Sequence, residues 1–175
     1  MKYQETEGDL IALAKAGEFN VIAHGCNCFC TMGAGIAPQM ARAFGVDTLP
    51  GEHPDSRGDI RKLGNIEWKM WGHPKNLIVV NAYTQYGFGR NHSEGTEVPL
   101  DYEALTMCMR KINYVFKGKH IGLPRVGCGL AGGIWDSSEL PLNKLQALPF
   151  GFKDVKTIIQ TELKDCDITI VNYKP

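Results

Sequence analysis

The sequence predicts an α/β fold in which a central, mostly parallel sheet is covered by helices. Two observations predict this class. Short β-rich runs alternate with segments of helical periodicity along the 175 residues. The β-rich runs are also apolar almost throughout, which is typical of parallel strands buried on both faces. A chain of this length suggests one domain, covering 1–175.

Apolar runs rich in β-branched residues define the strands. Four of them are predicted as strands, at 20–24 (NVIAH), 76–83 (NLIVVNAY), 120–126 (HIGLPRV) and 167–173 (DITIVNY). The weaker run NIEWKMW at 65–71 is expected to form a strand paired with 77–82. The opening segment KYQETEG is expected to be an edge strand.

Helical periodicity marks the segments between these strands. In 36–44 the apolar residues recur at every fourth position, and Pro38 is tolerated in a first turn. The segments 101–116 and 152–163 each carry one apolar stripe, and a shorter helix is expected to start near Asp136. The polar, Pro- and Gly-rich stretch 45–62 predicts a long excursion, and 84–99 predicts a second long loop.

Composition argues against several function classes. Lysine and arginine number 19, as do aspartate and glutamate, so the net charge is zero and no general binding to nucleic acid or membranes is expected. The N-terminus lacks the apolar run of a signal peptide, and no segment has the length of a membrane span. We therefore expect a cytoplasmic protein whose six cysteines are thiols.

Two glycine-rich loops each follow a strand and precede a helix. The first lies in HGCNCFCTMGAGIA (24–37) and the second in GLPRVGCGLAGGIWDSS (122–138). Loops of this kind meet at the carboxyl edge of a parallel sheet, and exposed N–H groups at a helix start suit phosphate. Neither loop matches GxxxxGK[ST], and neither has a GxGxxG that is followed directly by a helix, since Gly33-Ala-Gly35 lacks the third glycine. A tight turn explains one such loop, but two on one edge favour a phosphate-bearing ligand.

The cysteines and polar residues of these loops leave alternatives open. Cys26, Cys28 and Cys30 lack the paired spacing of a zinc site, so buried packing roles are favoured over a thiol nucleophile activated by His24. His24 is either a hydrogen-bonding residue at the sheet edge or an acid–base group. Asp136 begins DSSE, a capping-box pattern, but it could also position water.

Other candidates carry the same two interpretations. Asn27 could shape a turn or bind a ribose hydroxyl, and Asp9 could cap the first helix or accept a hydrogen bond from an exocyclic amine. Aromatic residues after a central strand could anchor their loop or line a wall against a sugar or base: Tyr83, Tyr86 and Phe88.

Three motifs, taken in order, resemble those of the macrodomain family: GDL (8–10), AHGCNCFCTMGAGIA (23–37) and IGLPRVGCGLAGGIWD (121–136). With the strand–helix pattern they cover most of the chain. The resemblance is to the branch that contains the yeast-type ADP-ribose-1''-phosphate phosphatases and the human terminal ADP-ribose glutamate hydrolase. It implies a three-layer α/β/α fold with a central mixed, mostly parallel sheet.

The resemblance also implies a role for each matching residue. Asp9 would receive the adenine amino group with Leu10 beside it, and Asn27 would meet the distal ribose. The loop around the distal ribose and diphosphate would be Gly33, Ala34, Gly35 and Ile36. Backbone N–H groups for the diphosphate would come from Gly127, Cys128, Gly129, Leu130 and Ala131. In phosphatase-like members, a histidine at the position of His24 is implicated in turnover.

Two departures bear on the reaction. The glutamate hydrolase has an aspartate after GCGL where this chain has Ala131, and a lysine after its middle strand where this chain reads NAYTQYG (81–87). The sequence therefore predicts an ADP-ribose-binding phosphatase that removes the 1''-phosphate of ADP-ribose 1''-phosphate. His24 would act as acid and Asp136 would orient water, with no metal or cofactor. The alternatives are a non-catalytic module that binds ADP-ribose or an ADP-ribosylated protein, and a hydrolase of protein-linked ADP-ribose or O-acetyl-ADP-ribose.

Overall fold

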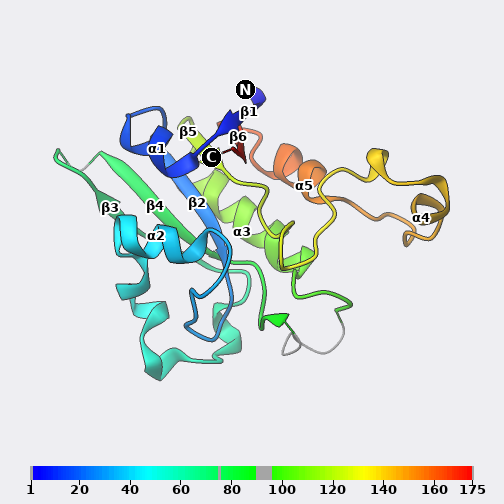
Figure 1. The fold of residues 1–175 in the computed structure, drawn as a ribbon, viewed down its shortest axis with the longest axis horizontal. Coiled ribbons are helices and arrows are strands. Elements are labelled where there is room, and N and C mark those ends of the chain that lie inside the picture. Colours follow the sequence, from blue (N-terminus) through cyan, green and yellow to red (C-terminus); the bar gives the residue numbers. More distant parts are fainter. Residues whose placement is uncertain (1, 75, 90–95, 175) are drawn as a thin grey trace.

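A computed structural model describes residues 2–74, 76–89 and 96–174 of the chain. Its centre is a six-stranded sheet in the order β1-β6-β5-β2-β4-β3 (Figure 1). The strands are β1 (Tyr3–Gly8), β2 (Val21–Cys26), β3 (Ile66–Trp71), β4 (Leu77–Tyr83), β5 (His120–Leu123) and β6 (Asp167–Tyr173). The pairs β1·β6, β6·β5, β5·β2 and β2·β4 are parallel, and β3 alone pairs antiparallel, with β4.

Helices cover both faces of the sheet: α1 (Leu10–Lys15) and α2 (Ala37–Phe44) pack on one face, and α3 (Tyr102–Val115) and α5 (Val155–Glu162) pack on the other. A further short helix, α4 (Leu142–Gln146), has no buried residue. Successive residues of β2 alternate between the faces: Val21 and Ala23 pack with α3 and α5, whereas Ile22 packs with α1 and α2. The predicted three-layer α/β/α fold with a mixed, mostly parallel sheet is therefore confirmed.

Local signals place the helix boundaries. Asp101 caps α3 by accepting a hydrogen bond from the Ala104 N–H (3.0 Å), and Asp154 caps α5 through Thr157 (2.8 Å). Gly45 ends α2 in the left-handed conformation, with φ of 67°. The predicted strand at 65–71 is confirmed as β3, and the predicted edge strand at the N-terminus is confirmed as β1.

The region after Asp136 differs from the prediction. Asp136 caps only one 3₁₀ turn (Ser137–Glu139), and α4 starts later, after Pro141. Proline fixes its own φ and restricts the residue before it, so a helix that began at Asp136 could not run through this position. In Figure 1 the segment that carries α4 extends away from the sheet.

The 45–62 excursion has more order than a loop. It contains four short 3₁₀ helices, Val46–Thr48, Pro50–Glu52, Pro54–Ser56 and Ile60–Lys62. Its backbone is joined to strand ends, because the Gly58 N–H donates to Cys28 O (2.7 Å) and the Gly64 N–H after it donates to Tyr83 O (2.8 Å). Among the described residues, no helix has the length and apolar character needed to cross a membrane.

Candidate functional site

The candidate site lies at the carboxyl edge of the five parallel strands. Three segments that leave this edge carry the predicted ligand residues: the turn at Asp9 after β1, the loop 27–36 after β2, and the loop 124–136 after β5. We call the last two the β2–α2 loop and the β5–η6 loop. Parallel strands bring these segments to one edge although they are far apart in the sequence.

The β2–α2 loop is held by side-chain hydrogen bonds at its start and is open at its tip. Asn27 accepts a hydrogen bond from the Phe29 N–H (2.9 Å) and donates to Thr31 O (3.0 Å). Gly33, Ala34 and Gly35 are exposed, and a Cβ built at Gly33 or Gly35 would meet nothing within 4 Å. Ile36 directly precedes α2, which has no side-chain cap. The tip can therefore be approached closely, whereas Asn27 shapes the turn.

The glycines of the β5–η6 loop divide into two kinds. Gly127 and Gly133 are packed, because a Cβ at either would come within 2.7 Å or less of the Leu100 side chain. The Gly133 N–H also donates to Gly127 O (2.7 Å). Gly129 is exposed, and its Cβ would meet nothing within 4 Å. The packed glycines form the loop and Gly129 presents its backbone outward.

Backbone donors are free at the tip of the β5–η6 loop. Within the described residues the N–H groups of Gly129, Leu130 and Ala131 donate no hydrogen bond. Ala131 O accepts from the Leu100 N–H (3.0 Å), which anchors the end of this run. The Cys128 thiol donates to Val126 O (3.4 Å), and burial raises its pKa to about 12, so it is no thiolate. Three consecutive free N–H groups suit an anion.

His24 does not reach this edge. Its side chain is 0% exposed, and its Nε2–H donates to Asn81 Oδ1 (2.7 Å), while Asn81 Nδ2 donates to Val46 O (3.0 Å). Burial lowers the pKa of His24 to about 4, so the ring is neutral. A general acid has to reach the oxygen that it protonates, so the predicted acid role of His24 is not supported by its position. Instead, His24 joins β2 and β4 to the excursion.

Removing His24 is expected to affect stability, with a pH dependence of known sign. In His24→Ala, a cavity and an unpaired Asn81 should cost about 2–4 kcal/mol at pH 7. Because the pKa of His24 is lower in the folded protein than in the unfolded chain, the free energy of unfolding of the wild type falls by roughly 3 kcal/mol between pH 6.5 and pH 4. The variant has no such titrating ring and lacks this decrease. Urea unfolding at pH 7 and pH 4 should therefore show that the difference in free energy of unfolding between the wild type and His24→Ala is smaller at the acid pH. Equal pH slopes would contradict a buried neutral ring.

Asp136 and Asp9 are engaged in caps. The Asp136 carboxylate accepts hydrogen bonds from the N–H (3.0 Å) and hydroxyl (2.6 Å) of Ser138, which lower its pKa. Lys156 Nζ lies 3.5 Å from its other oxygen. Asp9 caps α1 by accepting from the Ala12 N–H at 3.1 Å. In both, the capping interpretation is confirmed.

The structure corrects two predicted contact residues. Tyr83 is buried, and its hydroxyl donates to Glu67 Oε1 (2.6 Å), so it lies under the excursion and forms no wall for a ligand. The Leu10 side chain is in the core between α1 and the sheet, so it offers no side-chain surface beside Asp9. Phe88 is 38% exposed and packs edge-to-face on Phe29 of the β2–α2 loop, with ring centroids 6.3 Å apart.

The cysteines have packing roles. Cys26 and Cys28 are buried in one cluster with Tyr83, as the alternation CxCxC predicts. Burial raises the pKa of both thiols, that of Cys28 to about 12. Cys30 lies at a turn, where its thiol faces Gly51 O (3.4 Å) and His53 O (3.3 Å) of the excursion. The three residues join the strand end to the excursion, and neither buried thiol is poised as a nucleophile.

Two buried charged residues within the excursion were not predicted. The side chain of Glu52 is buried, although it lies in a polar, Pro-rich stretch that predicts exposure. Nearby, Lys62 is also buried and donates to Gly51 O (2.7 Å). No local pattern in 45–62 marks these two residues, because their burial depends on how the excursion folds back on the strand ends.

The whole chain has relatives in sequence and in structure. No known family model matches it. It is 31% identical over 174 residues to the uncharacterised 17.5 kDa protein in the tk-vs intergenic region of Enterobacteria phage T4, with 97% of this chain and 95% of that protein aligned. A structure of unknown function from Bacteroides thetaiotaomicron superposes with a TM-score of 0.68 at 23% identity, covering 98% of both chains.

Structures described as macrodomains share the fold. The macrodomain of Mycobacterium tuberculosis DarG gives a TM-score of 0.62 at 18% identity, covering 99% of this chain and 97% of that one. Thermosipho africanus DarTG, solved in complex with ADP-ribose, gives 0.64 at 14% identity, covering 100% of this chain and 42% of that one. The chain therefore belongs to the same family as the 17.5 kDa phage T4 protein, and its fold is the macrodomain fold.

Proposed function

We propose that the chain binds ADP-ribose at the carboxyl edge of its sheet, across the β2–α2 and β5–η6 loops. The observation that carries the proposal is the pair of open loop tips, at 33–35 and 129–131, where a ligand can approach the backbone. The same fold in DarTG, which was solved with ADP-ribose, supports the choice of ligand.

Each part of the edge suits one part of this ligand. The free N–H groups at Gly129, Leu130 and Ala131 suit the diphosphate oxygens, because N–H donors to an anion form strong hydrogen bonds. The uncapped start of α2 after Ile36 adds the positive end of a helix. Asp9 uses only Oδ1 for its cap, so its second oxygen is available to an exocyclic amine.

The reaction proposed at this site is hydrolysis of ADP-ribose 1''-phosphate. A water oxygen would attack phosphorus, the bond from phosphorus to the C1'' oxygen would break, and inorganic phosphate and ADP-ribose would leave. Asp136 is the candidate to orient that water, because it is the carboxylate at the end of the β5–η6 loop and it is ionised at neutral pH. Binding without turnover is the second candidate, and the burial of His24 favours it.

A panel of three substrates separates these outcomes. Inorganic phosphate released from ADP-ribose 1''-phosphate is expected, with no ADP-ribose released from an ADP-ribosylated protein or from O-acetyl-ADP-ribose. Asp136→Asn should slow phosphate release by about a hundredfold. The amide still caps the following turn, so the fold and ADP-ribose affinity should remain. ADP-ribose binding with no release from any substrate would leave a binding module, and an unchanged rate in Asp136→Asn would remove that residue from catalysis.

A further inference from the structure

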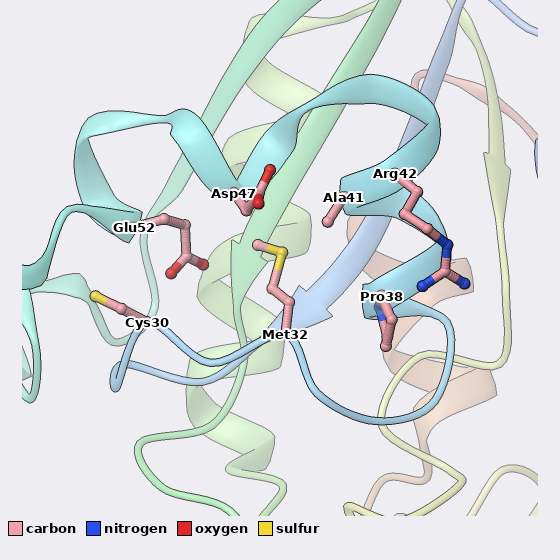
Figure 2. Close-up of a pocket in the computed structure, with 7 residues that line it drawn as sticks. All are labelled: Cys30, Met32, Pro38, Ala41, Arg42, Asp47 and Glu52. Carbon is pink, nitrogen blue, oxygen red and sulfur yellow. The ribbon is translucent and has the colours of Figure 1, made fainter.

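A pocket separate from the two loop tips lies behind the β2–α2 loop, between α2 and the excursion. It has a volume of about 380 Å³ and is lined by Cys30, Met32, Pro38, Ala41, Arg42, Asp47 and Glu52 (Figure 2). A hollow of this size accepts a single planar ring or a short side chain. We call it the Glu52 pocket. None of its residues belongs to the open loop tips assigned above to ADP-ribose.

The Glu52 carboxylate points into this pocket without a partner. Glu52 is 8% exposed, and neither Oε1 nor Oε2 accepts a hydrogen bond within the described part of the chain. Figure 2 shows the carboxylate between the sulfur atoms of Cys30 and Met32. Burial raises its pKa to about 7, and the neighbouring Lys62 ammonium, Cys30 thiol and Tyr83 hydroxyl oppose the shift. A buried carboxyl group without hydrogen bonds costs free energy, so a ligand that donates hydrogen bonds to Glu52 would remove this cost on binding.

Donors near Glu52 are committed elsewhere. The Lys62 ammonium donates to Gly51 O (2.7 Å) and lies 3.3 Å from Ser56 Oγ. The Tyr83 hydroxyl donates to Glu67 (2.6 Å). The Arg42 guanidinium points away from Glu52, and Asp47 lines the pocket above Glu52 (Figure 2). The missing donors for Glu52 therefore have to come from outside these residues.

We propose that the Glu52 pocket binds a planar group with two adjacent N–H donors, as a guanidinium ion or the guanine edge presents. Two parallel N–H···O bonds match the two carboxylate oxygens, which a single ammonium donor cannot do. Met32, Pro38 and Ala41 supply apolar walls for a flat group. The Met32 side chain lies beside the carboxylate. A methionine side chain is flexible, so it can move aside and admit the flat ligand group. This proposal is independent of ADP-ribose binding.

Two matched probe pairs test the proposal by titration, followed through the ¹³C-methyl resonance of Met32. Methylguanidinium is compared with methylammonium, and guanosine with inosine, which lacks the 2-amino donor. We expect the first member of at least one pair to shift the Met32 signal and to bind about tenfold tighter than its partner. A response to the first pair would indicate that the ligand is a guanidinium group, and a response to the second pair would indicate that it is a guanine base.

Glu52→Gln should weaken that binding by about tenfold or more, because the amide offers one acceptor and no charge. Asp47→Asn is the control at the mouth and should retain binding within a few fold. ADP-ribose affinity should be unchanged in both variants. Equal binding within both pairs, no Met32 shift with any probe, or wild-type affinity in a folded Glu52→Gln protein would each overturn the proposal. The Met32 readout on the wild type decides the matter if the variant does not fold.

Discussion

A glutamate in place of Gly129 is expected to weaken ADP-ribose binding by at least about a hundredfold while the protein stays folded. Gly129 is exposed, and a Cβ there meets nothing within 4 Å, so the larger side chain has room. Its carboxylate would stand beside the backbone N–H groups proposed to bind the diphosphate. Repulsion between like charges at about 4 Å costs several kcal/mol at an effective dielectric constant near 20, which is enough for the predicted loss.

The matched control is Gly129→Gln, which has the same shape without the charge. We expect it to lose about tenfold at most, since only crowding remains. Calorimetric titration of ADP-ribose into the three proteins measures the difference, and urea unfolding checks that each is folded. If Gly129→Glu binds as the wild type does, the diphosphate is not at this loop. If the two variants lose affinity equally, size and not charge explains the effect.

Alanine in place of Gly133 is expected to destabilise the protein by about 3 kcal/mol, the largest effect on stability of any loop-glycine change considered. The added Cβ would lie 2.5 Å from Leu100 Cδ2 and 2.6 Å from Gly127 O. The second neighbour is backbone, and the Gly133 N–H is hydrogen-bonded to the same oxygen at 2.7 Å, so the loop cannot yield without losing that bond. Because Leu100 is a core residue, the strain passes into the α3 side of the sheet.

Gly33→Ala is the control, because its Cβ would meet nothing within 4 Å. Its free energy of unfolding should stay within about 0.5 kcal/mol of the wild type. Urea unfolding monitored by circular dichroism measures both variants. A Gly133→Ala protein as stable as Gly33→Ala would show that the β5–η6 loop can repack, and the division of its glycines into packed and open would be wrong.

The sequence predicts most of this fold because strands and helices carry their own periodicity. The runs at 76–83 and 167–173 are mainly apolar and become the strands β4 and β6, whose central residues are buried. The apolar stripe of 101–116 faces the core as α3. Patterns of this kind involve residues that are close together in the sequence, so they can be recognised without knowing the tertiary contacts. The strand–loop–helix order also places the two glycine loops at one edge.

The site was predicted less completely because burial there depends on contacts between distant segments. His24 shares a face of β2 with Ile22, but only the packing of the segment around Val46 decides that the ring is covered. Tyr83 is likewise buried by Glu67 and Gly51. Nothing within 45–62 predicts that Glu52 turns inward. The capping residue Asp136 was ambiguous for another reason, since one carboxylate serves equally as a cap or as a group facing a ligand.

The central claim, that two loops form one ADP-ribose site, is tested most directly by amide chemical shifts during titration with ADP-ribose. We predict that amides in both 33–36 and 129–131 shift together, at the same ligand concentrations, and that the Met32 methyl signal, as a reporter of the separate Glu52 pocket, shifts little. Shifts confined to one loop, shifts centred elsewhere, or no shifts at saturating ADP-ribose would contradict the claim.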